Sequence, residues 1–226
     1  MIRAVILFAI SLIAITSCSS RQTSSTLDTE NLITSATTTP IIKKASTIIA
    51  IDAGHGGKDP GALSYDKRHL EKHMTLATVM MVKNYLEDMG YDEILTRNAN
   101  TTLPLYKRAA IANKINADLF VSIHYNSSLN RKANGIEIFY YKTSTTSKQY
   151  AQHVLDALIQ HTKAPSRGIK PAYFTVLEET TMPAILVEGG FMSNPAEMHI
   201  LKKPQYLNVI AYSIAEGIHW SLSIEH

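Results

Sequence analysis

Cysteine is nearly absent from this sequence: Cys18 is the only one among 226 residues, so no disulfide can form within the chain. Basic residues are in slight excess, 22 Lys and Arg against 19 Asp and Glu, and they are not clustered. A nucleic-acid partner is therefore not expected, because phosphate binding requires a basic patch or stripe. The sequence also lacks internal repeats, and its length suits one ordinary domain of about 200 residues with a tail.

The N-terminal residues are typical of an exported protein. Arg3 precedes an apolar run from Ala4 to Ile15, which is short for a membrane span of about 20 residues and suits the hydrophobic part of a secretory signal. The run leads into Ile15-Thr16-Ser17-Cys18, which resembles the bacterial lipobox, where the cysteine is lipidated and becomes the mature N-terminus. We expect a lipoprotein-type signal peptide over residues 1–17 and a periplasmic protein whose lipid on Cys18 holds it to the membrane. The alternative is an ordinary cleaved signal or an uncleaved anchor with an incidental cysteine.

Residues 18–46 are rich in Ser and Thr, nearly free of aromatic residues and without periodicity, which predicts a tether. The folded domain is expected over residues 47–226. Within it, apolar strand patterns alternate with helical periodicity, which predicts an α/β fold of three layers: a mixed β-sheet flanked by helices on both faces. We predict strands at 48–51, 93–97, 119–123, 135–141 and 184–187, and helices at 69–89, 104–116, 147–163 and 205–222.

Candidate metal ligands stand where these elements begin or end. The stretch Ile48–Gly61 opens as a buried strand and continues as a glycine-rich loop that contains His55. His124 follows another predicted strand and Glu71 stands near the start of the first helix, and ligands bind at strand ends in open α/β sheets. Two imidazoles and one carboxylate are the composition of catalytic zinc sites, in which water fills the remaining position. Glu188, on an apolar strand where an unpaired carboxylate is costly, is the natural general base.

Each of these residues also has an ordinary structural interpretation, and spacing alone does not bring them into one site. Five stretches, however, occur in order over about residues 47–222: His55–Gly61, Glu71, Ser122–Asn126, Arg167–Lys170 and Pro183–Pro195. Together they resemble the zinc-dependent N-acetylmuramoyl-L-alanine amidases of the AmiA/AmiB/AmiC and CwlV type, the amidase_3 family.

The resemblance implies that His55, Glu71 and His124 bind one zinc ion and that Glu188 is the catalytic glutamate. It also implies the substrate, which would be the amide between N-acetylmuramic acid and the L-alanine of the peptidoglycan stem peptide, and a place in cell-wall remodelling and cell division. Glu188 would take a proton from the attacking water and return it to the leaving amine, so no covalent intermediate is needed.

Asn126 and Arg167 are further candidates, for holding the muropeptide, Arg167 through a stem-peptide carboxylate. The segments between the motifs are short and continuous, whereas some periplasmic relatives carry a long helical insertion that covers the zinc until an activator displaces it. We therefore expect a monomer with an uncovered site that needs no activator. No separate peptidoglycan-binding repeat is present, so binding would rest on the cleft and the lipid tether.

Three other interpretations stay open. Ser64 and Lys67 form a Ser-x-x-Lys pattern, followed by Ser128-x-Asn130 and by Lys142-Thr143-Ser144, in the order used by penicillin-binding proteins. In those enzymes the lysine deprotonates a nucleophilic serine, which here would add a penicillin-sensitive D-Ala carboxypeptidase activity at Ser64. The other two interpretations are a non-catalytic peptidoglycan-binding lipoprotein and a zinc peptidase that cuts within the stem peptide.

Overall fold

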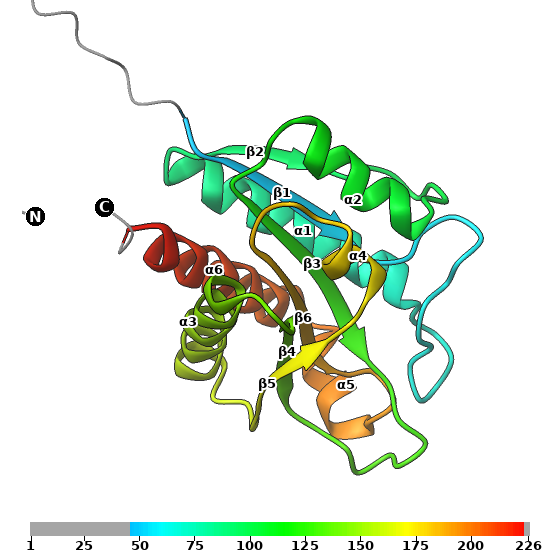
Figure 1. Cartoon of the computed structure of the whole chain (residues 1–226). Coiled ribbons are helices and arrows are strands. Elements are labelled where there is room, and N and C mark those ends of the chain that lie inside the picture. Colours follow the sequence, from blue (N-terminus) through cyan, green and yellow to red (C-terminus); the bar gives the residue numbers. More distant parts are fainter. Residues whose placement is uncertain (1–45, 224–226) are drawn as a thin grey trace, which may run out of the picture. The chain divides into compact units, whose positions relative to one another are not determined.

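The computed structural model describes residues 46–223, which build a six-stranded sheet with helices on both faces (Figure 1). The strands are β1 (Ile48–Ala53), β2 (Asp92–Leu95), β3 (Leu119–Asn126), β4 (Ile136–Tyr141), β5 (Ser166–Ala172) and β6 (Ala184–Phe191). They lie in the order β2-β1-β3-β6-β4-β5, in which only the β4–β6 pair is antiparallel. The predicted mixed sheet and α/β domain are confirmed. The predicted signal peptide, Cys18 and tether lie outside the described residues.

Six helices in the described part of the chain cover the sheet: α1 (Glu71–Asp88), α2 (Leu105–Lys114), α3 (Thr145–Thr162), α4 (Thr175–Glu178), α5 (Pro195–Leu201) and α6 (Pro204–Ser223). Residues of α1, α3 and α6 pack on one face of the sheet, and residues of α2 and α4 pack on the other (Figure 1). Among residues 46–223, no helix combines the length and apolarity that crossing a membrane demands.

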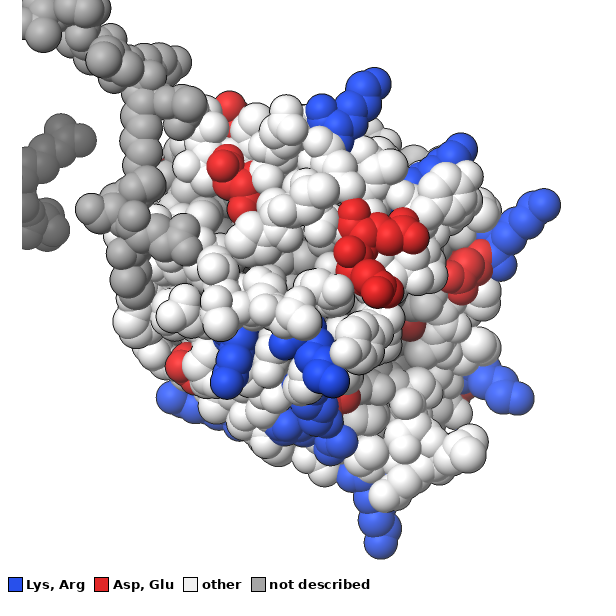
Figure 2. Space-filling view, in the orientation of Figure 1, with Lys and Arg blue, Asp and Glu red and all other residues white. Residues whose placement is uncertain are grey.

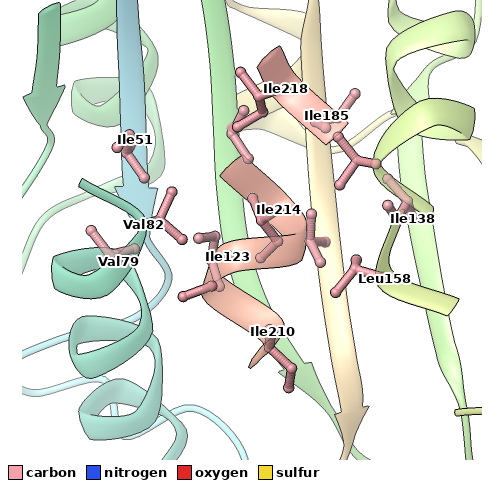
Figure 3. Packing of buried hydrophobic residues seen from close by; sticks show 14 of the residues in the cluster. Ile51, Val79, Val82, Ile123, Ile138, Leu158, Ile185, Ile210, Ile214 and Ile218 are labelled. Atoms are coloured by element: carbon pink, nitrogen blue, oxygen red, sulfur yellow. The ribbon is translucent and has the colours of Figure 1, made fainter. Parts of the chain in front are cut away.

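The two faces bury different amounts of apolar side chain. The face under α1, α3 and α6 carries the larger core, where Ile51 lies beside Val82 of α1 and Ile123 lies beside Ile214 of α6 (Figure 3). Successive side chains of a strand point to opposite faces, so the intervening residues point the other way. There a smaller core around Phe120 and Leu186 lies under α2 and α4.

On this second face, the apolar side chains give way to polar ones along the strands toward their C-terminal ends. Each of three strands begins on this face with an apolar residue and continues with polar ones. The apolar residues are Ala50 in β1, Phe120 in β3 and Leu186 in β6. The polar residues that follow them are Asp52 in β1, Ser122, His124 and Asn126 in β3, and Glu188 in β6. Because these three strands are parallel neighbours, their polar residues meet at one edge of the sheet. The small core thus leads directly into the candidate site.

The structure differs from the predicted elements in several respects, and one is that β3 continues past Ile123 to Asn126, so that His124 lies inside the strand and not after it. The sequence pattern does not predict β5, because Gly168 and Pro171 argue against a strand; β5 lies at the edge of the sheet, where proline is tolerated. The short helices α4 and α5 are not predicted either. In addition, β6 continues past Glu188 to Phe191, because it stays paired with β3 through a register shift after His124. Glu188 therefore lies inside β6 and not at its end.

Candidate active site

Three side chains from three elements converge at one point. His55 stands in the loop after β1, Glu71 opens α1 and His124 lies in β3, and their donor atoms all fall within 4.8 Å of one another. His55 Nε2 is 3.0 Å from Glu71 Oε2 and 3.1 Å from His124 Nδ1. His124 Nδ1 is in turn 3.0 Å from Glu71 Oε1. The three residues that the sequence predicts as ligands therefore form a group that could hold a metal ion.

The Glu71 side chain is held as a carboxylate. Burial alone would raise its pKa, but hydrogen bonds with His124 and His55 keep the pKa well below the usual range for a glutamate. The backbone N–H groups of Ala62 and Tyr125 also donate to its two oxygens, at 2.7 and 3.0 Å. An ionised carboxylate, fixed by the backbone beside two imidazoles, is preassembled for a cation.

Asp59 and Arg108 hold His55 from two sides. Asp59 Oδ2 lies 2.8 Å from His55 Nδ1, which directs Nε2 toward the other two ligands. Arg108 donates to the main-chain oxygen of His55 at 2.6 Å and to the buried carboxylate of Asp52 at 2.8 Å. His55 has a φ of 62°, a left-handed conformation that non-glycine residues rarely adopt. The two bonds of Arg108 help to maintain this strained conformation.

Two glycines of the loop give the ligands room. A Cβ atom at Gly54 would lie 2.3 Å from the ring of His124, and one at Gly61 would lie 2.6 Å from both Glu71 and His55. Gly61 also has a φ of 65°, which favours glycine. The glycine-rich composition of the loop is thus explained by the close approach of the three ligands.

Glu188 faces the same cavity. This cavity, of about 590 Å³, is lined by Glu188 together with His55, Glu71 and His124. Within residues 46–223, Glu188 Oε2 is the one buried side-chain polar atom without a hydrogen-bond partner. Burial, and then the nearby charges of Glu71 and Glu137, raise the pKa of Glu188 well above that of an ordinary glutamate. A buried carboxyl group with an unpartnered oxygen, beside three candidate metal ligands, is suited to proton transfer.

Asn126 lines the cavity, whereas Arg167 lies beyond its lining. Both side chains bond to Glu137, a residue that the sequence alone does not single out. Asn126 Nδ2 donates to Glu137 Oε1 at 2.7 Å, and Arg167 Nε and Lys170 Nζ donate to Oε2 at 2.8 and 2.5 Å. Although burial alone would raise the pKa of Glu137, the bonds from Lys170 and Arg167 lower it. Contact of Arg167 with substrate stays a prediction.

Ser64 lies outside the lining of the cavity and is 2% exposed. Its hydroxyl donates to Asp66 Oδ1 at 2.6 Å and accepts from the backbone N–H groups of Arg68 and His69. Lys67 is exposed and belongs to the same turn, with a φ of 58°. The serine therefore closes a turn and does not open a helix, and this environment does not favour a serine nucleophile.

An α/β domain that brings two imidazoles and a carboxylate together at one edge of the sheet, with a further carboxyl group in the same cavity, has the arrangement of a metal-dependent hydrolase. Residues 49–219 match the sequence profile of the family described as N-acetylmuramoyl-L-alanine amidase, Amidase_3. The chain belongs to this family.

Individual relatives support the assignment. The germination-specific N-acetylmuramoyl-L-alanine amidase of Bacillus subtilis is 33% identical over 186 residues, covering 76% of this chain and 78% of the relative. The catalytic domain of the amidase CwlV from Bacillus (Paenibacillus) polymyxa var. colistinus is 37% identical, with a TM-score of 0.75 over 79% of this chain and 99% of that domain. The CwlD amidase of Clostridioides difficile, solved in complex with the GerS lipoprotein, is 34% identical, with a TM-score of 0.77 over 79% of this chain and all (100%) of CwlD.

Proposed function

We propose that this chain is a zinc-dependent peptidoglycan hydrolase that cleaves the amide between N-acetylmuramic acid and the L-alanine of the stem peptide. Family membership supports the class of reaction. The observation that carries the mechanism is the buried Oε2 of Glu188, which has no hydrogen-bond partner and belongs to a side chain that shares a cavity with the three candidate ligands. The environment of Ser64 removes the support for a second, serine-based activity.

The donor set fits zinc. His55, Glu71 and His124 would hold one ion per chain, since two imidazoles and one carboxylate leave a position open for the reaction. Asp59 supplies the outer hydrogen bond that ligating imidazoles in zinc sites usually have. Zinc supplies Lewis-acid chemistry, which makes water a stronger nucleophile near neutral pH and polarises a carbonyl group.

Glu188 carries the proton transfers. It accepts a proton from the attacking water and returns it to the alanine nitrogen, which then leaves as an amine. The two roles require a carboxyl group that exchanges protons near neutral pH, and burial in the cavity raises the pKa of Glu188 in this direction. Asn126 has one amide hydrogen fixed on Glu137, and its second hydrogen is available to a substrate oxygen.

We also infer that the protein is exported and anchored through a lipid on Cys18. The sequence Ile15–Cys18 after the apolar run supports this, and peptidoglycan lies on the outer side of the cytoplasmic membrane. Replacing Cys18 with Ser should move the protein from the membrane fraction to the soluble extracytoplasmic fraction. Unchanged membrane retention of this variant would contradict a lipid anchor.

The site is further proposed to work in a monomer without an activator, because the loop that carries His55 contains no inserted helix that could cover the candidate ligands. The loop from β1 to α1 spans residues 54–70, and its glycines lie against the ligands. A purified chain that stays inactive until a partner is added would contradict this point. The GerS complex of CwlD makes a lipoprotein the first partner class to test in that case.

The test of function is incubation of the purified full chain with a muropeptide, with and without a chelator, followed by mass analysis of the products. We expect chelator-sensitive release of an intact stem peptide with a free L-alanine amine, and release about a thousandfold slower from the Glu188→Gln variant. Release of stem-peptide fragments would indicate a zinc peptidase, and loss of only the terminal D-alanine with or without chelator would indicate a carboxypeptidase. Binding without any product would indicate a non-catalytic protein.

A further inference from the structure

Aromatic side chains are exposed at one rim of the catalytic cavity. Tyr173 and Phe174, which join β5 to α4, line the cavity although 59% and 41% of their surface is exposed. Leu105, at the start of α2, lines the cavity and is 54% exposed. We call Tyr173 and Phe174 the aromatic rim, and Leu105 adds an aliphatic side chain to the lining of the same cavity. An apolar surface continuous with a catalytic cavity is available to a substrate.

Neighbouring rings on β4 keep Tyr173 and Phe174 in place. The ring centres of Phe139 and Phe174 are 5.0 Å apart at an interplanar angle of 61°, and those of Tyr141 and Tyr173 are 6.3 Å apart at 80°. Such edge-to-face contacts are favourable for aromatic pairs. Because the rings already rest on other rings, binding a ligand orders them little further, which lowers the entropic cost of association.

Charges near the cavity differ between β5 and α4. Arg167 and Lys170 on β5 both pair with the carboxylate of Glu137, and Arg167 also interacts with Glu197. Glu178 and Glu179, at the end of α4 close to the rim, are both exposed. Figure 2 shows Lys and Arg side chains over the part of the molecule where Figure 1 places β5, and Asp and Glu side chains over α4. An anionic group is therefore attracted toward β5 and repelled from α4.

The peptide part and the sugar part of the proposed substrate also differ in charge. A stem peptide carries free carboxylates, whereas N-acetylmuramic acid is neutral once its own carboxyl group is in the amide. A pyranose also presents C–H groups on its faces, which pack against aromatic rings. The charge of the β5 side thus suits the peptide, and the aromatic rings of the rim suit the sugar.

We propose that Tyr173 and Phe174 form a saccharide subsite that binds the N-acetylmuramic acid ring beside the scissile amide. Lys142, whose Nζ lies 5.3 Å from the centre of the Tyr173 ring, is placed to donate to hydroxyl groups of the same sugar. The proposal rests on the proposed amidase function and adds which part of the molecule recognises the glycan. It makes Tyr173 a determinant of specificity for the sugar.

Two substrates separate the sugar from the peptide: an N-acetylmuramoyl-tripeptide, and an N-lactoyl-tripeptide that has the same scissile amide without the sugar. The zinc-loaded full chain is assayed on both. For Tyr173→Ala we expect KM for the first substrate to rise about tenfold with kcat unchanged, the fold-change that about 1.4 kcal/mol of lost binding represents. KM for the N-lactoyl-tripeptide should not change, and Tyr173→Phe, which keeps the ring, should resemble the wild type.

Tyr106→Ala is the matched control. Tyr106 is 56% exposed, close to the value for Tyr173, but it is not among the residues that line the cavity. It should leave both KM values unchanged. Far-UV circular dichroism and zinc content establish that each variant is folded and loaded.

An unchanged KM of Tyr173→Ala for the N-acetylmuramoyl-tripeptide would overturn the proposal, and so would an equal rise for both substrates, which would place the peptide on the rim. Failure of the wild type to cleave either substrate would instead refute the proposed function. Binding of N-acetylmuramic acid amide, followed by ligand-observed NMR, decides the subsite without turnover. Tyr173→Ala should weaken that binding about tenfold, and equal binding by variant and wild type would overturn the subsite.

Discussion

The face of the sheet under α1, α3 and α6 and the face under α2 and α4 are built from the same strands, yet they bury different kinds of side chain. The first carries an extended apolar core, in which Ile51, Val82 and Ile214 are fully buried. The second carries a small apolar cluster and then buried charges, among them Asp52 and Arg108, which are 0% and 2% exposed. The two faces therefore contribute differently to folding and to chemistry.

Burying a charge lowers the stability of the fold, and pairing it with an opposite charge at best recovers most of that loss. The buried charges of the second face serve the site instead, because they hold the loop after β1 in position, as Arg108 does for His55. Close packing on the first face supplies the stability that the second lacks. The comparison predicts that substitutions on the two faces should have different effects. Those on the second face should lower activity and leave stability unchanged, and those on the first face should lower stability and leave activity unchanged.

The largest expected effect is on the rate. Replacing Glu188 with Gln should lower kcat about a thousandfold, because general acid-base groups contribute about two to four powers of ten. Zinc content should stay the same, and the free energy of unfolding should not fall, since the buried carboxyl group has no hydrogen-bond partner on Oε2 to lose. Activity assays, metal analysis and urea unfolding of the same preparation check this. A marked loss of stability would place Glu188 among the structural residues.

On the other face, Ile214→Ala should act on stability alone. Ile214 is fully buried in the large core, and truncating such a side chain costs about 3 kcal/mol through lost burial and a residual cavity. The variant should keep the wild-type kcat/KM at temperatures where it is folded. Urea unfolding measures the free energy of unfolding, and an assay at low temperature measures kcat/KM. A folded variant with lost activity would mean that the two faces are coupled.

A smaller effect is expected from weakening the hydrogen bond between His55 and Asp59. Asp59→Asn should weaken zinc binding about tenfold, because it removes the carboxylate that orients His55 and raises its basicity. Competition with a chromophoric chelator measures the affinity. Asp66→Asn is the control, since Asp66 bonds to Ser64 in a turn outside the cavity lining and should leave zinc affinity unchanged. Equal affinities for wild type and Asp59→Asn would show that the bond has no role in metal binding.

The last effect concerns pH. Glu137 and Glu188 are cross-strand partners in the β4–β6 ladder, but their pKa values shift in opposite directions. The lowered pKa of Glu137 means that its contribution is present above the ordinary carboxyl pKa and is lost as pH falls through the folded-state value. The raised pKa of Glu188 means that the metal-free protein loses stability as pH rises from the ordinary value through the raised one.

Unfolding of the metal-free chain should therefore be measured from about pH 3 to pH 8, a range that extends to both sides of the ordinary carboxyl pKa. Glu137→Gln should flatten the acid side of the stability profile, and Glu188→Gln should flatten the side toward neutral pH. If both variants keep the wild-type profile, the two carboxyl groups do not titrate as their surroundings indicate.

The site illustrates how much a sequence can predict. The sequence predicts His55, Glu71, His124 and Glu188 because they stand in short stretches in register with a family, and the structure brings all four to one cavity. The supporting residues carry no such signal. Arg108 meets the carbonyl of His55 across 53 positions of the chain, a contact that no local pattern records.

The undetected strand has a similar explanation. Gly168 and Pro171 weaken the local preference of β5 for a strand, and pairing with β4 at the sheet edge overrides that preference. The aromatic rim escapes prediction because Tyr173 and Phe174 look like ordinary residues until β5 and α4 place them at the cavity. Asp59, four residues after His55 in the same loop, is the one supporting residue that local spacing could have indicated.

The most direct measurement of the central claim is hydrolysis of a muropeptide in water enriched in the heavy oxygen isotope, with mass analysis of both products. Attack by water on the lactyl carbonyl places one heavy oxygen in the carboxyl group of N-acetylmuramic acid and leaves an unlabelled stem peptide with a free L-alanine amine. We expect this pattern from the zinc-loaded chain, and we expect Glu188→Gln to form both products about a thousandfold more slowly. Heavy oxygen in a carboxyl group of a shortened stem peptide would contradict the account, because the bond broken would then lie within the peptide.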